Sequence, residues 1–297
     1  LFGFGGLDNA GKTNITNLVS STGVVATDTT GVGTARYGLA ASGYGGDKAI
    51  FGFGSTSSLQ NTTNLVSNTG VVGSDQTGVG TSREKLAAAG YGEDKALFGF
   101  GGNGDVNFTA YNTTNLVSNA GVVASDTTGV GSARNGLAAA SYGGDKALFG
   151  FGFYNTGYEH ERFNTTNLVS NTGVVASDST GVGTIRDELA CAGYGGDKAI
   201  FGFGYGAGSG GDWLNITNLV SNTGVVSSDS TGVGSAKYTL AAAGYGGDKA
   251  IFGFGYATGG RTSTTNLVSN TGVVATDTTG VGTVRTELAA AGYSTTA

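Results

Sequence analysis

Short apolar runs alternate with glycine-rich turns along the whole chain. In one typical stretch, Leu-Ala-Ala-Ala-Gly-Tyr is followed by Gly-Gly-Asp and then by Lys-Ala-Ile-Phe-Gly-Phe-Gly. Two apolar runs on either side of Gly-Gly favour a β-hairpin. After a variable segment come Thr-Asn-Leu-Val-Ser, an Asn-Thr-Gly turn and Val-Val-Ala-Ser-Asp. This pattern predicts four short strands and almost no helix.

The pattern occurs six times, which makes the repeat the main organising feature of the sequence. In the second copy, the Asn of Thr-Asn-Leu-Val-Ser is Asn64, and it is followed by Asp75, Arg83 and Tyr91. Every other copy has an Asp, a cation and a Tyr at the same intervals from this Asn, without insertion or deletion. The six anchoring asparagines are Asn17, Asn64, Asn115, Asn167, Asn218 and Asn266.

Four short strands repeated six times in units of about 50 residues are typical of a β-propeller. Both faces of each predicted sheet carry apolar or very small residues, as expected for a sheet packed between two neighbours. The Ala/Gly-rich strand should be innermost, where space is smallest. We therefore predict one all-β domain over residues 1–297, a six-bladed β-propeller of four-stranded blades. Its ring would close by pairing of the C-terminal strand, Leu288–Tyr293, with the N-terminal blade at Leu1–Gly5.

The order of motifs resembles the kelch repeat. Arg134, the small apolar strand Leu137–Ala140 and the run Lys146-Ala147-Leu148-Phe149-Gly150-Phe151-Gly152 follow the kelch order. The chain departs from that family because it lacks the Trp after the third strand and, in most copies, the full Gly-Gly doublet. Near-identical Phe-Gly-Phe-Gly copies also resemble kelch-like repeat proteins encoded by bacteriophages and other viruses. This resemblance implies a propeller on a virion or another extracellular surface.

Composition narrows the classes of function. The chain has 58 Gly, no Pro, 12% charged residues and a formal net charge of −6. A nucleic-acid-binding protein needs a clustered basic surface, so we expect no nucleic-acid partner. No apolar run approaches the length of a membrane-spanning helix, so we expect no membrane insertion. The sequence shows no signal peptide, and the absence of Met suggests a processed product or a segment of a longer chain. The single Cys191 replaces small residues of other copies and is predicted to lie in the core.

The copies differ mainly between the second and third predicted strands. These variable segments contain the only Trp and the only His, together with several tyrosines. In a propeller they lie on one face, where divergent aromatic loops on a rigid scaffold are typical of recognition sites. Neutral drift in unconstrained loops would also explain their divergence. The candidate ligand-binding residues are Tyr154, Tyr158, His160, Arg162, Tyr205, Asp212, Trp213, Tyr111 and Tyr256.

A second candidate feature is one cation in every copy, after the fourth predicted strand. The six cations could form a ring around the channel mouth and receive an acidic partner. Alternatively, each could pair with an Asp of its own repeat, such as Asp28 or Asp47, and be structural. Asn-x-Thr sequons precede the third strand in most copies and are explained by turn chemistry without a glycan. The six cations are Arg36, Arg83, Arg134, Arg186, Lys237 and Arg285.

Catalysis is not indicated. One His excludes a copper oxidase site of the kelch-like kind, and His160 has no Ser or Asp partner recognisable from spacing. Calcium-binding and phosphate-binding loops are also missing from the sequence. We therefore expect no cofactor and no enzymatic activity. The predicted function is a binding or structural module that recognises a surface glycan or protein through its loops. The alternatives are an architectural protein contacting other virion or assembly subunits, and a kelch-type protein-interaction scaffold.

Overall fold

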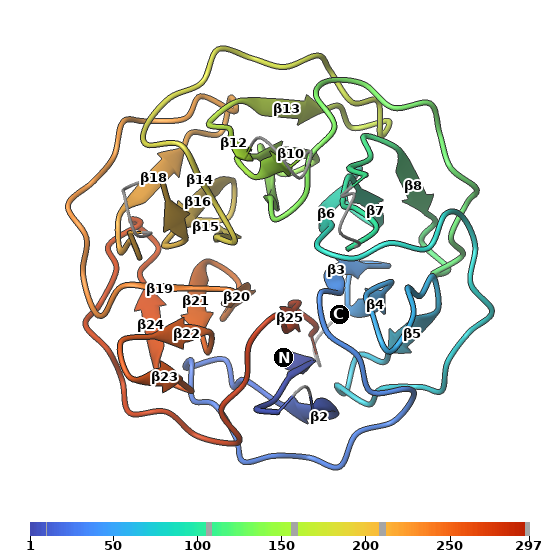
Figure 1. Cartoon of the computed structure of the whole chain (residues 1–297), viewed down its shortest axis with the longest axis horizontal. Helices are drawn as coiled ribbons and strands as arrows, with labels where there is room; N and C mark the ends of the chain where they lie inside the picture. The colour runs from blue at the N-terminus through green and yellow to red at the C-terminus, as the bar shows by residue number, and fades with distance from the viewer. Residues whose placement is uncertain (10, 105–108, 156–159, 208–211, 295–297) are drawn as a thin grey trace.

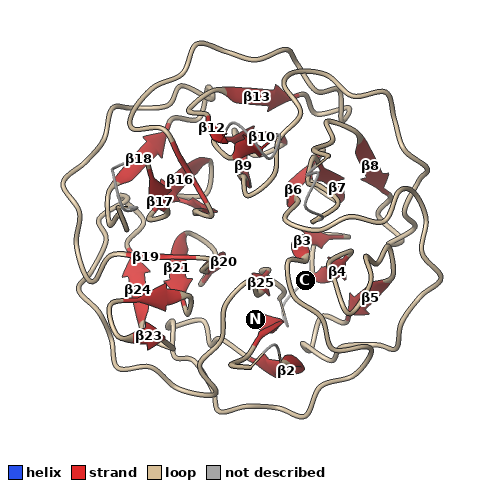
Figure 2. Cartoon of the chain, viewed as in Figure 1, coloured by secondary structure: helices blue, strands red, loops and turns tan. Residues whose placement is uncertain are grey.

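The computed structural model describes residues 1–9, 11–104, 109–155, 160–207 and 212–294, and within these ranges it is all-β without a helix (Figure 2). Each repeat contributes three main strands. The first strands are β3 (Ala40–Tyr44), β6 (Ala87–Tyr91), β9 (Ala138–Tyr142), β15 (Ala190–Tyr194), β20 (Ala241–Tyr245) and β25 (Ala289–Ala290). The second strands are β1 (Phe2–Gly6), β4 (Lys48–Gly52), β7 (Lys95–Gly99), β10 (Lys146–Gly150), β16 (Lys198–Gly202) and β21 (Lys249–Gly253). The third strands are β2 (Lys12–Asn17), β5 (Thr63–Val66), β8 (Thr114–Val117), β13 (Thr166–Val169), β18 (Thr217–Val220) and β24 (Thr265–Val268).

These strands form small antiparallel sheets in which the second strand lies between the first and the third. The orders are β3-β4-β5, β6-β7-β8, β9-β10-β13, β15-β16-β18, β20-β21-β24 and β25-β1-β2. The last sheet joins the two ends of the chain, because Phe2 pairs with Ala290 and Gly3 with Ala289. The predicted pairing of the C-terminal strand with the N-terminal strand is therefore confirmed.

The expected fourth strand is only partly formed. Residues that follow the Asn-Thr-Gly turn meet the third strand at isolated bridges, for example Val72 with Val66 and Gln76 with Thr63. Between these bridges the side chain of Asn64 donates hydrogen bonds to the Gly73 carbonyl at 3.0 Å and to Asp75 at 2.8 Å. The backbone adds a bond from Gly73 N–H to the Leu65 carbonyl at 2.8 Å, so side-chain and backbone bonds together hold this segment. Over the described residues these sheets contain three strands, and the prediction of four-stranded blades was wrong.

The sheets are arranged around a common centre, with the first strands innermost (Figure 1). Neighbouring first strands pack on one another in a continuous series: β3 on β6, β6 on β9, β9 on β15, β15 on β20, β20 on β25 and β25 on β3. The small side chains of these strands allow this approach, as the sequence predicted.

The core lies between neighbouring sheets and explains the Phe-Gly-Phe motif. Phe51 and Phe53 are both fully buried. A Cβ atom added to Gly52, between them, would lie 2.7 Å from Cζ of Phe98 in the next repeat, so only glycine fits beneath that ring. Phe53 has a φ of 64°, a left-handed conformation that is rare for a bulky residue. Phe201 and Phe203 are fully buried in the same way.

Seven short strands lie outside the three main strands of each repeat and shape the loops. They are β11 (Phe153–Asn155), β12 (His160–Arg162), β14 (Arg186–Asp187), β17 (Tyr205–Gly206), β19 (Lys237–Tyr238), β22 (Tyr256–Ala257) and β23 (Gly260–Arg261). Figure 1 labels β12, β14, β19, β22 and β23, and Figure 2 labels β17, on neighbouring repeats of one side of the molecule.

Candidate functional site

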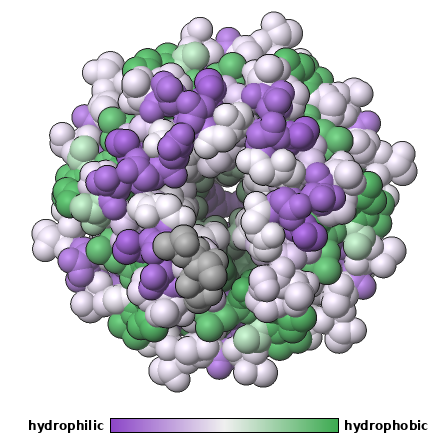
Figure 3. All heavy atoms as spheres, turned by 180° about the vertical axis from the view of Figure 1, so that it is seen from behind, coloured by the Kyte–Doolittle hydropathy of each residue, from purple (hydrophilic) through white to green (hydrophobic). Residues whose placement is uncertain are grey.

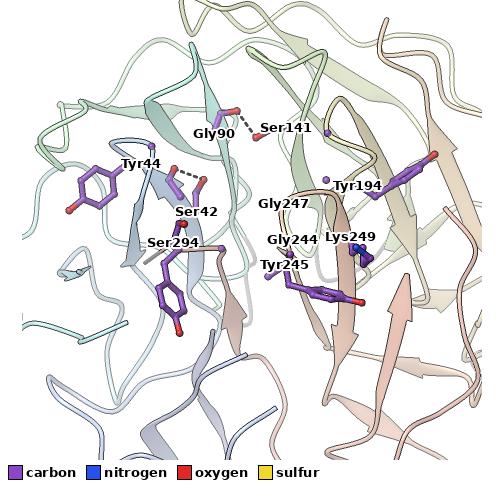
Figure 4. A pocket seen from close by; sticks show the side chains of 18 of the residues that line it. Ser42, Tyr44, Gly90, Ser141, Tyr194, Gly244, Tyr245, Gly247, Lys249 and Ser294 are labelled. Carbon is purple, nitrogen blue, oxygen red and sulfur yellow. Dashed lines mark hydrogen bonds between the residues drawn. The ribbon is translucent and has the colours of Figure 1, made fainter. Parts of the chain in front are cut away.

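A cavity of about 890 Å³ occupies the centre of the molecule. Its lining includes the first strands and the Gly-Gly turns that follow them. Figure 3 shows the molecule hollowed at its centre, with hydrophilic side chains gathered around the opening. In Figure 4 the rings of Tyr44, Tyr194 and Tyr245 point away from the middle of the cavity. The tyrosine rings pack instead on neighbouring turns. The Tyr44 ring, for example, covers Gly121 so closely that a Cβ atom added to this glycine would lie 3.0 Å from the ring. The rest of the lining combines glycines and serines with lysines of the turns, among them Lys48 and Lys249.

A circle of backbone hydrogen bonds joins the six repeats around a second, much smaller cavity. One residue from each repeat donates its N–H to the carbonyl of the preceding repeat, at distances of 2.7 to 2.9 Å. Gly38 donates to Glu287, so the circle is complete. Its members are Gly38, Lys85, Gly136, Glu188, Thr239 and Glu287. Lys85 and Glu188 also form an ion pair of 2.6 Å, next to a small cavity of about 80 Å³ lined by leucines.

The variable segments lie beside the connections that lead into the first strands, as the sequence predicted. Tyr37 pairs with Ser55, Glu84 with Gly102, and Asn135 with Phe153 in isolated bridges. In the later repeats the same contact is a short sheet, formed by β14 with β17 and by β19 with β22. We call the surface formed by these segments the loop face.

Four aromatic side chains gather on the loop face. Trp213 lies 5.8 Å from Tyr238 and 5.7 Å from Tyr256, and Tyr238 lies 5.4 Å from Tyr205, measured between ring centroids. The rings come from two neighbouring repeats and are held by the pairings of Tyr205 with Trp213 and of Tyr238 with Tyr256. All four side chains are half-buried. We call these four residues the aromatic cluster.

A charged group connects the aromatic cluster to the hairpin formed by β11 and β12. The Arg162 guanidinium lies over the ring of Tyr205 at 5.0 Å and donates from Nε to Asp187 at 2.6 Å. His160 Nε2 lies 3.3 Å from the same carboxylate, and its ring stacks on Phe153 at 4.6 Å. Burial raises the pKa of Asp187 to about 6, with Glu188 acting in the same direction and Arg162 opposing the shift. One buried carboxylate therefore joins two neighbouring variable segments.

The predicted ligand-binding residues are only partly brought together. Tyr205, Trp213 and Tyr256 belong to the aromatic cluster, and Arg162 and His160 reach it through Asp187. Tyr154 is half-buried in β11 opposite Glu161, and the Asp212 side chain is exposed beside Trp213. Tyr111 lies in the connection between β7 and β8, in a different repeat. Tyr158 lies outside the described residues.

Sequence reasoning missed Tyr238 and Asp187 because both lie outside the segments between second and third strands. Each directly follows the repeat's cation. The residues at this position are Tyr37, Glu84, Asn135, Asp187, Tyr238 and Thr286. This variation, next to an almost invariant cation, was the signal that could have found them. The structure also corrects the view that His160 has no Asp partner, since that partner is Asp187.

The predicted ring of cations at the channel mouth is wrong. All six side chains are fully buried, and they bind the next repeat. Arg36 donates from Nε to the Phe53 carbonyl at 2.8 Å and from NH2 to Asn64 Oδ1 at 2.6 Å. Its nearest carboxylate is Asp75 of the next repeat, at 3.7 Å, so the predicted pairing with Asp28 or Asp47 is also wrong. Burial lowers the pKa of Arg36 to about 10, and Asp75 partly offsets that shift.

The same bridge continues across the chain ends, where Arg285 donates to Asn17 at 2.6 Å and lies 3.9 Å from Asp28. The guanidinium of Arg36 also lies 4.6 Å from the Phe4 ring centroid. These cations are therefore structural links between repeats.

Two further sequence predictions concern single residues. Cys191 is buried within a core cluster, as predicted, and burial raises the pKa of its thiol. The sequon asparagines that the structure describes use their amide groups internally. Asn61, for example, donates to the Gly80 carbonyl at 2.6 Å. Asn107 lies outside the described residues.

The described ranges contain neither a metal-binding cluster nor a membrane-spanning helix. No group of three or more His, Cys, Asp or Glu side chains in these ranges is placed to hold a metal ion. No described helix is long and apolar enough to cross a bilayer. No protein-family model matches this chain, and no curated protein sequence matches it.

Proposed function

We propose that the chain is a six-bladed β-propeller of the kelch-like kind. Three observations support this fold. The backbone hydrogen bonds from Gly38 to Glu287 return to their starting repeat, the first strands pack in a closed series, and β1 pairs with β25. The hydrogen bond from the repeat cation to the Asn of the next repeat also occurs across the chain ends, where Arg285 donates to Asn17. The three-stranded sheets then act as blades, and their outermost segments are held by isolated backbone hydrogen bonds together with those of the Asn side chain.

We further propose that this propeller is a non-enzymatic binding module that recognises its target through the loop face. The observation that carries this proposal is the aromatic cluster. Its four half-buried rings come from segments that differ among the copies, while the packing between repeats stays the same. Tyr and Trp are the residue types most enriched in binding hot spots. The target is a glycan or protein on another surface, and the module itself is displayed on a virion or other extracellular surface.

An architectural role is the second candidate, and a specific feature favours it. One valine in each repeat is 64–66% exposed on the segment after the Asn-Thr-Gly turn, so the same apolar side chain is presented at six equivalent positions. These perimeter valines could contact other subunits of an assembly. The third candidate, a scaffold that binds acidic peptides, loses support because the six repeat cations are buried and already bridged. The perimeter valines are Val24, Val71, Val122, Val174, Val225 and Val273.

The test compares two double variants in attachment of the labelled protein to a panel of cell surfaces. Trp213→Ala combined with Tyr256→Ala should abolish attachment and leave the melting temperature nearly unchanged. Val71→Ala combined with Val122→Ala should leave attachment intact. The opposite pattern, with attachment lost only in the valine variant, supports the architectural role and overturns recognition through the loop face.

A further inference from the structure

We propose that the ligand of the aromatic cluster is a neutral glycan, whose sugar rings stack on Trp213, Tyr238 and Tyr256. This inference rests on the proposed binding function of the loop face and adds the chemical class of the ligand. It follows from three features of the site: the geometry of the rings, the pairing of the cations and the position of the exposed carboxylates.

The rings are adjacent but tilted. Centroid distances of 5.4 to 5.8 Å place the four rings next to one another, and their planes meet at 38° to 79°. None of the four residues lines either of the two cavities on the channel axis. A pyranose ring has a broad apolar face of C–H groups, and this face packs well on an aromatic ring, so each ring can hold one sugar unit. A sugar that stacks on the ring faces also leaves the tyrosine hydroxyl and tryptophan N–H groups able to form hydrogen bonds.

The cations beside the rings have internal partners. Arg162 is bound by Asp187, with only 13% of its side chain exposed, and Arg261, next to Tyr256 in the sheet of β22 and β23, is paired with Asp8. An anionic ligand would have to compete with these carboxylates. Since the buried Arg162–Asp187 pair is costly to break, recognition of a carboxylate, sulfate or phosphate group by Arg162 is disfavoured.

The exposed charges near the rings are acceptors of hydrogen bonds. Asp212 adjoins Trp213, Glu161 pairs with Tyr154 across the hairpin, and the Asp8 side chain is 73% exposed. Carboxylates accept strong hydrogen bonds from hydroxyl groups and repel anions. Sugar hydroxyls therefore suit the edge of the cluster, while its centre takes the apolar face of the sugar. A basic protein segment is the competing ligand, because it would also match the carboxylates.

The chain provides a direct optical probe of this site. Trp213 is the only tryptophan, so tryptophan fluorescence reports the cluster alone. The titrants are neutral oligosaccharides of glucose, galactose, mannose and N-acetylglucosamine, with oligogalacturonate and oligolysine as charged competitors. We expect a saturable change in Trp213 emission with at least one neutral oligosaccharide. No response to any neutral oligosaccharide, or a response to oligolysine or oligogalacturonate alone, overturns the proposal.

Variants separate a specific site from a loss of folding. Tyr238→Ala and Tyr256→Ala should each weaken binding of the responding oligosaccharide by about tenfold or more, as for an aromatic hot spot. Tyr37→Ala is the matched control, because Tyr37 occupies the position of Tyr238 in another repeat. It should leave binding unchanged. Equal loss in the control and in the cluster variants would contradict a local site.

Pretreatment of the cell surfaces distinguishes this inference from the proposed function. Periodate cleaves the vicinal diols of sugars, whereas protease removes surface proteins. Attachment lost after periodate and kept after protease supports a glycan. Attachment lost only after protease overturns the glycan and leaves recognition by the loop face intact. Attachment that survives the Trp213 and Tyr256 double variant overturns the proposed function itself.

Discussion

Lys237 is the only one of the six repeat cations that is not arginine, and the structure shows the consequence. Arg186 donates to Asn218 Oδ1 at 2.6 Å, but the shorter Lys237 reaches only Thr264, at 3.4 Å. The buried Asn266 Oδ1 has no hydrogen-bond partner within the described part of the chain. A buried acceptor without a donor costs free energy, and a planar guanidinium meets this geometry where an ammonium does not.

Lys237→Arg should therefore raise the free energy of unfolding by about 1 kcal/mol. The reciprocal variant, Arg186→Lys, should lower it by a similar amount because it leaves Asn218 without its donor. The free energy of unfolding of both variants is measured by denaturant unfolding, and its dependence on denaturant concentration should be the same as for the wild type. A lower free energy of unfolding for Lys237→Arg than for the wild type would show that the site cannot accommodate the larger guanidinium group.

Asp187 offers a residue-scale prediction on pH. Its pKa is about 6 in the folded chain, against an ordinary value of 3.8, so the folded state binds more protons between these two pH values. Stability of the wild type therefore rises, through this group, as pH falls from about 6 to about 4. Well above pH 6 the buried Asp187 carboxylate is charged, and its destabilising effect on the folded state is then fully present.

Asp187→Asn removes the titrating carboxyl group and with it this pH dependence. The stability of the wild type relative to this variant should therefore rise by up to about 3 kcal/mol as pH falls from 7 to about 4, since two pKa units correspond to that energy. The measurement is the difference between the two stability curves from pH 4 to pH 7. A difference that stays flat over this range contradicts the raised pKa.

At the scale of single elements, the Phe-Gly-Phe strand gives the clearest contrast between core and surface. Phe51 is fully buried between neighbouring sheets and lies 5.1 Å from Phe4, measured between ring centroids. Phe51→Ala should cost about 3–5 kcal/mol of unfolding free energy, because it removes a buried ring and leaves a cavity. Val71→Ala, at a side chain that is 64% exposed, should change stability by less than about 0.5 kcal/mol. A loss below about 1 kcal/mol for Phe51→Ala would be inconsistent with this packing.

The elements that could be predicted from sequence are those defined by local chemistry. The Gly-Gly turn between two apolar runs predicted the β3–β4 hairpin, and the Ala/Gly strand predicted the inner wall. The irregular fourth segment could not be predicted, because it depends on hydrogen bonds from the Asn64 side chain. Arg36 had the same limitation, because its partner Asn64 lies in another repeat, where sequence spacing indicates no contact. The aromatic cluster was predicted in part. The variable segments that were expected to bind a ligand contain Trp213, but Tyr238 lies outside them.

At the scale of the whole molecule, most contacts between repeats recur where the chain ends meet. The differences are that β25 is shorter than the other first strands and that, among the described residues, Arg285 Nε lacks the carbonyl partner that Arg36 Nε has in Phe53. Gly253 lies under the ring of Phe2 just as Gly52 lies under the ring of Phe98. A Cβ atom added to Gly253 would lie 2.8 Å from Phe2 Cζ, and one added to Gly52 would lie 2.7 Å from Phe98 Cζ. Thr283 donates to Asp28 as Thr34 donates to Asp75. The stability of the proposed propeller should therefore depend on completing the circle and not on which junction carries the ends.

A circular permutant tests this equivalence. In other copies, six positions separate the Tyr that ends the first strand from the apolar residue of the second, as from Tyr44 to Ile50. Joining Ala297 to Leu1 through one added glycine restores this spacing, and opening the chain between Ala49 and Ile50 creates equivalent new ends. The permutant should unfold in one cooperative transition, with a melting temperature within about 5 °C of the wild type, because every contact between repeats is kept. A control opened between Phe98 and Gly99, inside β7, should be markedly less stable. If the first permutant melts in two steps or fails to fold, the circle of equivalent junctions is not what holds this molecule together.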